Sequence, residues 1–188
     1  MYLFRLVISL MLCSLASISA ASPLPVNTRL GGDFTLPSTL GQPASLSAWK
    51  GKVVLLNFGF THCPDVCPMV ISRMVRIHKE VDDPEEVQTL FISFDHERDT
   101  IPHLASYLSA FDKRLVGMSG TDEQIAKVAS QFGVVYIPDK SESAAGRLYT
   151  HSDFIYLLDR QGRVRALFGS DDAIDDMTEK VESLIEED

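Results

Sequence analysis

The sequence contains few cysteines and few basic residues. Only three of its 188 residues are cysteines, and 26 acidic residues outnumber 17 basic ones, for a net charge of -9. Nucleic acid is therefore excluded as an expected partner, because a phosphate backbone attracts basic surfaces. The chain also shows no internal repeat and no second domain boundary. Its length predicts one domain with a leader, and its 45% hydrophobic content is typical of a globular domain.

The first residues resemble a targeting segment. Arg5 is the only charge among the first 28 residues, and an apolar run followed by small residues comes after it. This pattern predicts a signal peptide over residues 1–21, or an N-terminal membrane anchor if it is not cleaved, although the run is short for a span of about 20 residues. The protein is thus predicted to be exported to the periplasm, either soluble or anchored to the inner membrane.

Export has a consequence for the thiols. One cysteine, Cys13, lies in the leader, so Cys63 and Cys67 are the only cysteines of the expected mature chain. Thiols in an oxidising compartment do not stay reduced by default, so a reductant or a metal must hold them. Residues 22–30 are interpreted as a linker, and residues 31–188 as the folded domain.

The apolar pattern of that domain predicts alternating strands and helices. Apolar runs predict buried strands over 52–58 and 87–94, and a shorter strand over 134–136. Apolar residues at three- and four-residue steps predict a helix over 66–81, and further helices are expected over 100–110, 121–131 and 171–187. Two strands, 152–158 and 163–168, flank the turn 159–162 and predict a hairpin. This order predicts an α/β protein of thioredoxin-like fold, with a mixed central sheet and helices on both faces.

The two cysteines lie where the strand 52–58 is followed by a helix. The partial positive charge of a helix N-terminus favours thiolate, which binds metals and attacks disulfides. Residues four apart in a helix lie one above the other, so Cys63 and Cys67 can face one point. Two thiolates suit Cu(I) or Zn(II). Two alternatives remain open: a structural disulfide, and a thiol–disulfide oxidoreductase in which Cys63 attacks and Cys67 resolves, both then being catalytic.

A site with two sulfurs needs another ligand, and the candidates are histidines. His151 directly precedes the hairpin strand expected to run beside the cysteine loop, so it is the favoured third ligand. His62 is expected at the rim of the site, and His103 on the surface. His78 is assigned to the solvated side of its helix. His96 is kept as a candidate auxiliary ligand.

Three patches resemble the Sco/SenC/PrrC family of copper-binding assembly proteins. They span residues 58–68 (FGFTHCPDVCP), 93–100 (SFDHERDT) and 151–159 (HSDFIYLLD). The resemblance implies a thioredoxin-like domain that binds Cu(I) or Cu(II) with Cys63, Cys67 and His151. It implies a metallochaperone rather than an enzyme, which delivers copper to the binuclear copper centre of cytochrome c oxidase or prepares its thiols. The implied partners are the oxidase subunit, or another periplasmic copper protein, and a thiol reductant such as a thioredoxin-like protein.

Smaller features complete the expectations. His96 stands where the family usually has proline, and Thr150 where it often has aspartate. Asp65 is expected to cap the helix that carries Cys67 by accepting a backbone N–H. Asp95, Arg98 and Asp99 are expected to form a structural cluster of charges. The polar segment 139–146 is predicted to be mobile.

Overall fold

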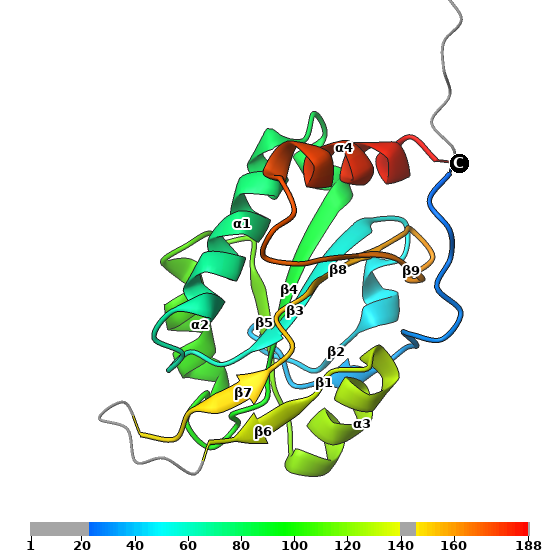
Figure 1. The fold of residues 1–188 in the computed structure, drawn as a ribbon. Helices are drawn as coiled ribbons and strands as arrows, with labels where there is room; N and C mark the ends of the chain where they lie inside the picture. The colour runs from blue at the N-terminus through cyan, green and yellow to red at the C-terminus, as the bar shows by residue number, and fades with distance from the viewer. Residues whose placement is uncertain (1–22, 140–145, 188) are drawn as a thin grey trace, which may run out of the picture.

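A central mixed sheet organises the protein in the computed structural model, which describes residues 23–139 and 146–187. Its strands are β3 (Val53–Gly59), β4 (Val87–Ser93), β5 (Val116–Met118), β8 (Ile155–Leu158) and β9 (Val164–Phe168). They lie in the order β5-β4-β3-β8-β9. β3, β4 and β5 are parallel, whereas β8 is antiparallel to β3 and to β9 (Figure 1). This arrangement confirms the predicted mixed sheet.

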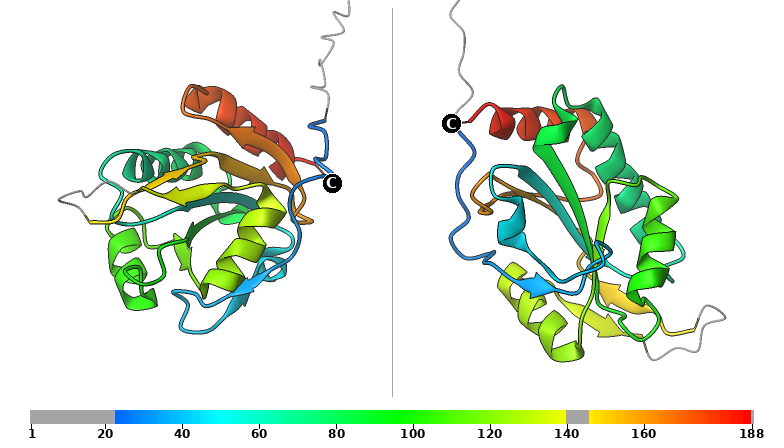
Figure 2. Two further views of the ribbon diagram at one scale, coloured as in Figure 1. Left: turned by 60° about the horizontal axis from the view of Figure 1, so that its bottom comes forward. Right: turned by 180° about the vertical axis from the view of Figure 1, so that it is seen from behind.

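Helices cover both faces of this sheet (Figure 2). The helices are α1 (Val66–Glu80), α2 (Ile101–Ser109), α3 (Asp122–Phe132) and α4 (Ile174–Ile185), with short 3-10 turns at Leu46–Trp49 and Pro84–Glu86. Alternate side chains of β3 point to opposite faces. Val53 and Leu55 pack into one core with α1, α2 and α4, and Val54 and Leu56 pack into the other with α3. Both faces of β3 are therefore buried from solvent, which explains its nearly continuous apolar sequence.

Two small sheets flank the central one. β1 (Thr35–Leu36) pairs with β2 (Ala44–Ser45), and β6 (Tyr136–Pro138) pairs with β7 (Tyr149–His151), both antiparallel. β6 begins at the last residue of the strand expected over 134–136. β5 and β7 were not predicted, because neither VGM nor YTH is a continuous apolar run. Within the described residues, no helix is long and apolar enough to cross a membrane.

Most helix ends lie within one residue of the predicted ones, but α4 and β8 each begin three residues later than expected, at Ile174 and Ile155. Thr121 caps α3, where its hydroxyl accepts from the Gln124 N–H and the Gln124 side chain accepts in return. Gly133 ends α3 in the left-handed conformation (φ 66°), and Gly162 supplies the positive φ of the β8–β9 turn (φ 79°). The leader, and all of the predicted mobile segment except Asp139 and Gly146, lie outside the described residues.

The assignment of His78 to the solvated side of its helix is wrong. His78 is only 4% exposed, and its Nδ1 lies 2.9 Å from the Thr89 hydroxyl on β4. α1 packs between β4 and α4, so its buried face is wider than one apolar stripe indicates. Burial is the main cause that lowers the pKa of this imidazole, with the charge of Arg114 acting in the same direction.

We expect this buried histidine to make the protein less stable in acid. A histidine whose pKa is lower in the folded state binds protons more readily in the unfolded chain. Its contribution is complete above the unfolded pKa of about 6.5 and is lost as the pH falls towards the folded value, by at most about 1.4 kcal/mol per pH unit. Urea unfolding at about pH 7.5 and about pH 5.5 measures this difference.

The matched control compares two histidine variants. His78→Gln should reduce the change in unfolding free energy between the two pH values, and His96→Gln controls for the loss of a histidine at a partly exposed position. An identical pH dependence in wild type and His78→Gln would contradict the assignment.

Candidate metal centre

The cysteine loop and His151 meet at one end of the central strands. Cys63 lies in the loop after β3, and Cys67 is the second residue of α1. β8 pairs with β3 in the register that sets Asn57 opposite Ile155, so the chain just before β8 lies beside the end of β3. One ligand atom from each of Cys63, Cys67 and His151 lies within 4.8 Å of the other two. The structure thus brings together the three residues selected from the sequence.

Tight packing positions the buried cysteine. Cys67 is 1% exposed, and its Sγ lies 3.6 Å from Nε2 of His151. A Cβ atom at Gly59 would lie 3.0 Å from that sulfur and 2.9 Å from the Phe91 ring. Real Cβ atoms are essentially never found so close to a neighbour. Glycine at the end of β3 therefore lets the first turn of α1 approach the sheet.

The two cysteines differ in their protonation. Hydrogen bonding from the Cys67 side chain is the main cause that lowers the pKa of Cys63, and His151 and the backbone N–H groups of Cys67 and Asp65 add to it, against the opposing effect of burial. The same thiol pair and burial raise the pKa of Cys67. The Cys67 N–H donates to Cys63 Sγ over 3.4 Å. These opposite shifts favour the thiolate on the more accessible Cys63.

His151 presents one defined nitrogen to the sulfurs. Its Nδ1 lies 2.8 Å from the Ser152 carbonyl oxygen, which can only accept, so in the neutral ring Nδ1 carries the proton and Nε2 has the lone pair that faces Cys67. Burial lowers the pKa of His151. The hydrogen bonds to Cys63 and to the Ser152 carbonyl raise it and outweigh burial, so the pKa lies above its usual value. The outer hydrogen bond fixes the tautomer that a metal ligand needs.

Aromatic side chains enclose the imidazole. The His151 ring meets Phe60 and Phe94 edge to face, with centroids 5.9 Å and 5.1 Å away. Phe94 also stacks on Tyr136 at 4.8 Å, and Tyr149 packs against both phenylalanines. Phe60 and Phe94 directly follow the neighbouring parallel strands β3 and β4, a signal that the sequence analysis did not use. These rings restrict the imidazole and exclude water from one side of it.

The other histidines considered as ligands, His96, His62 and His103, do not face the two sulfurs. His96 Nδ1 is 3.3 Å from an Asp122 oxygen at the start of α3, so it does not join the two sulfurs. His62, at the rim as expected, stacks on His103 with ring centroids 5.6 Å apart. Sequence reasoning did not connect these two residues, because the cysteine loop and the first turn of α2 meet only in the folded chain.

The capping expectation for Asp65 is wrong, and the expected charge cluster forms only in part, as the pair of Arg98 with Asp95. Asp65 occupies the residue before α1, but its side chain makes no capping hydrogen bond. Its backbone N–H instead contributes to the stabilisation of the Cys63 thiolate. Arg98 binds Asp95, with its Nε 2.5 Å from Oδ2. Asp99 binds the Thr61 N–H and the Ser93 hydroxyl, which fastens the cysteine loop to the end of β4.

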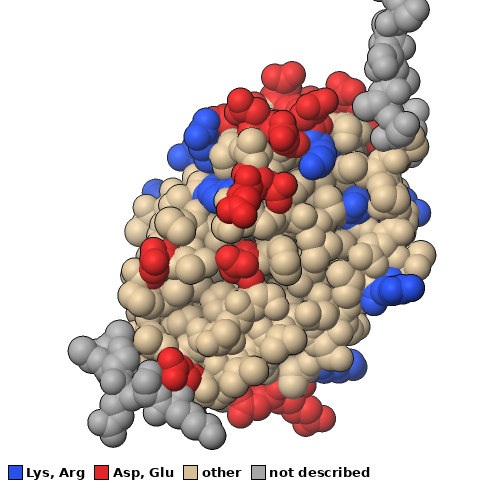
Figure 3. All heavy atoms as spheres, viewed as in Figure 1, with Lys and Arg blue, Asp and Glu red and all other residues tan. Residues whose placement is uncertain are grey.

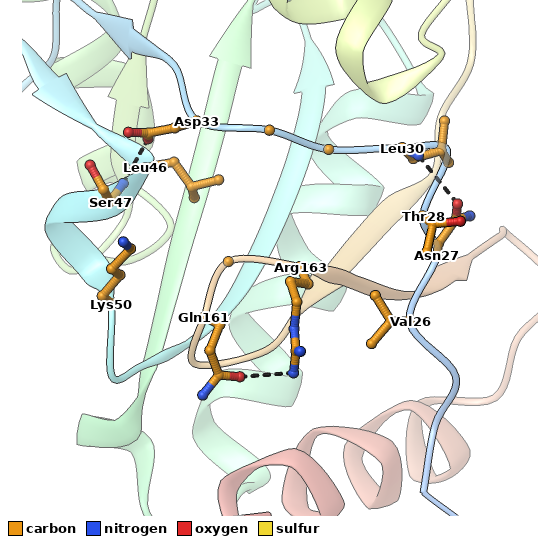
Figure 4. A pocket seen from close by; sticks show the side chains of 13 residues that line it. Val26, Asn27, Thr28, Leu30, Asp33, Leu46, Ser47, Lys50, Gln161 and Arg163 are labelled. Atoms are coloured by element: carbon orange, nitrogen blue, oxygen red, sulfur yellow. Dashed lines mark hydrogen bonds between the residues drawn. The ribbon is translucent and has the colours of Figure 1, made fainter.

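A separate cavity lies at the opposite end of the central strands. It has a volume of about 400 Å³ and lies between the N-terminal segment and the β8–β9 turn (Figure 4). Its lining includes Asp33, Lys50 and Arg163 but no cysteine or histidine. It therefore offers no ligand set for a soft metal.

Comparison with known proteins identifies the family. The model of the SCO1/SenC family matches residues 23–186. The chain belongs to the SCO1/SenC family. Its SCO1/SenC relatives include the mitochondrial SCO1 homolog of Homo sapiens, 36% identical over 74% of this chain and 48% of the human one. Another is the mitochondrial SCO2 of Saccharomyces cerevisiae, 38% identical over 73% of this chain and 46% of that one. The chain spans about half the length of these two relatives.

Solved SCO1/SenC structures share the fold. The copper-bound ScoI of Arabidopsis thaliana superposes with a TM-score of 0.78 at 31% identity, covering 84% of this chain and 98% of the other. The copper-bound ScoI of Bradyrhizobium japonicum gives 0.72 at 35% identity, covering 82% and 99%. The fold class expected from the sequence, a thioredoxin-like domain, is thus confirmed.

The asymmetry of the thiol pair predicts unequal reactivity. In reduced, metal-free protein at about pH 6, iodoacetamide should modify Cys63 roughly tenfold or more faster than Cys67, because only Cys63 is an accessible thiolate. Mass spectrometric fragmentation of the peptide that carries both residues distinguishes the two sites. In denaturant the rates should converge. Equal rates in the folded protein would contradict the assignment of the thiolate.

Proposed function

We propose that this protein is a metallochaperone that binds one copper ion with Cys63, Cys67 and His151. The observation that carries the proposal is the convergence of these three ligand atoms within 4.8 Å. Thiolate sulfur selects Cu(I), and imidazole is a good ligand for either oxidation state. The set thus holds Cu(I) and accepts Cu(II). Structural zinc sites usually have four protein ligands, so this set of three fits zinc less well.

The relatives support copper as the cargo. Two solved relatives above 30% identity, from Arabidopsis thaliana and Bradyrhizobium japonicum, are copper-bound. The family resemblance of the three sequence patches points further, to delivery of copper to the binuclear centre of cytochrome c oxidase or to preparation of its thiols. The recipient is then the copper-site subunit of the oxidase or another periplasmic copper protein.

The surface beside the site suits contact with a protein. An apolar hollow of about 530 Å³ adjoins the cysteine loop and is lined by residues such as Val66, Pro68 and Met69. Met69 is 54% exposed and Phe154 39%. Figure 3 shows acidic side chains gathered over α4 and few charged residues on the face below. A recipient can therefore approach through apolar contacts, which exclude water from the transferred ion.

A thiol–disulfide role is the second candidate, favoured by the lowered pKa of Cys63. In that role Cys63 attacks a disulfide and Cys67 resolves the mixed disulfide. Both roles need reduced thiols, so a thiol reductant such as a thioredoxin-like protein belongs to either proposal. Turnover of a mixed-disulfide substrate by metal-free protein, unaffected by His151→Ala, would favour this role over copper transfer.

We also propose that the protein is exported and works in the periplasm, soluble or anchored by residues 1–21. The buried Arg165 of β9 binds the Leu24 carbonyl through its Nε at 2.8 Å, and Glu187 through Nη1 at 2.6 Å. These contacts lie near the β8–β9 turn, at the opposite end of the sheet from the cysteines. An anchor would therefore leave the metal centre facing away from the attachment point.

The copper proposal predicts a specific loss of one ligand. With Cu(I) added anaerobically, the wild type should bind one ion with two sulfur ligands and one nitrogen ligand. His151→Ala should lose the nitrogen, and its affinity should fall by about tenfold or more. X-ray absorption reports both ligand types, and competition with a Cu(I) chelator reports the affinity.

His96→Ala is the matched control, because it removes another partly buried imidazole that does not face the sulfurs. It should leave stoichiometry, ligand count and affinity unchanged. Equal affinity and an unchanged nitrogen signal in His151→Ala would remove His151 from the site.

A further inference from the structure

A second group of metal-ligating side chains lies on the other side of the cysteine loop. One ligand atom from each of His62, Asp99 and His103 lies within 4.8 Å of the other two. His62 Nδ1 is 3.4 Å from Asp99 Oδ1, and the two imidazole rings stack at a 26° angle. The group combines the cysteine loop, the loop after β4 and the first turn of α2, so it forms only in the folded protein.

The His62–Asp99 separation of 3.4 Å is that of two ligands around one ion, and the Thr61 hydroxyl links all three side chains by hydrogen bonds. The Thr61 hydroxyl oxygen lies 2.5 Å from Asp99 Oδ1, 2.9 Å from His103 Nε2 and 3.1 Å from His62 Nδ1. Bonds of about 2.1 Å in a tetrahedral site set ligand atoms about 3.4 Å apart. Without metal, the hydroxyl can donate to the carboxylate and accept from both rings. An ion would bind the ring nitrogens that face the hydroxyl while the other nitrogen of each ring carries the proton, and the hydroxyl oxygen remains available as a fourth ligand.

The carboxylate is an independent sign of a bound cation. The Asp99 side chain is fully buried. Its Oδ2 accepts from the Thr61 N–H at 2.8 Å and from the Ser93 hydroxyl at 2.6 Å, and its Oδ1 accepts from the Thr61 hydroxyl and faces the His62 ring. The ion-pair partner that the described residues give it is the imidazole of His62. Buried charges are normally paired or coordinate metals, and ligating carboxylates are themselves held by hydrogen bonds.

We propose that His62, Asp99 and His103 form a second metal site, for a divalent ion of borderline softness such as Zn(II) or Cu(II). Two imidazoles and a carboxylate suit these ions, whereas the two thiolates of the first site select Cu(I). Ions can enter from solvent, because the His62 side chain is 37% exposed and His103 is exposed. His62 directly precedes Cys63, so one loop carries ligands of both sites.

The test fills the thiolate site first. Protein loaded anaerobically with one equivalent of Cu(I) is mixed with Zn(II), freed of unbound metal by gel filtration, and analysed for both metals. The wild type should retain one copper and one zinc per chain. His103→Ala should retain the copper and lose the zinc, and its fold should be intact because that side chain is exposed. His96→Ala should retain both ions.

Failure of this site and failure of the copper site give different results. Wild type that retains copper but no zinc, or zinc retention that His103→Ala does not change, overturns the second site alone. The double variant Cys63→Ser, Cys67→Ser tests it without thiolates. With Cu(II), its electron paramagnetic resonance spectrum should show coupling to imidazole nitrogens, and adding His103→Ala should weaken Cu(II) binding by at least about tenfold. Unchanged binding there also overturns the site.

Discussion

The antiparallel pairing of β8 with β3 is the constraint on which the metal centre depends. His151 lies 84 positions after Cys67 in the sequence, so only the tertiary structure can bring it to the cysteines. The register that sets Asn57 opposite Ile155 brings both segments to one sheet end. Asn57 reinforces it, because its buried side chain donates to the Phe154 carbonyl over 3.0 Å. A shift by one residue would turn the apolar side chains of β8 to the wrong faces, so core packing protects the geometry of the site.

The pairing of β6 with β7 then sets the direction of the imidazole. Tyr136 lies opposite His151 in that pair, and the Ser152 N–H donates to the Val135 carbonyl at 3.0 Å. The same serine accepts from the His151 ring through its carbonyl. Strand pairing, the Nδ1 hydrogen bond and ring packing therefore all fix the orientation of the His151 side chain. Two features position the cysteines in the same way. The close approach at Gly59 places the start of α1 against the sheet, and the buried Asp99 carboxylate holds the cysteine loop.

Sequence reasoning recovered features that have a local or motif-based signal. The alternating elements followed from apolar periodicity. Ligand chemistry and three recognisable patches selected Cys63, Cys67 and His151, which the structure brings together. His78 was misplaced because its partner, Thr89, lies on β4, and a helix packed against two elements buries more than one stripe. Asp65 has the residue type and position of a cap, but the backbone there (φ -139°, ψ -73°) differs from the extended conformation of a typical cap. Contacts such as His62 with His103 need the tertiary structure.

The chemistry of the cysteine loop follows from the opposite characters of its two sides. Towards His151 it presents sulfur, partly enclosed by aromatic rings, which favours a soft ion with few ligands. Towards α2 it presents an imidazole beside a buried carboxylate, which favours a harder, divalent ion. Thr61, His62 and Cys63 are consecutive, so the Asp99 bonds that hold Thr61 also limit where Cys63 can move. An ion that bound Asp99 would therefore stiffen the loop that releases copper in the proposed function, so the backbone between the two donor sets couples them.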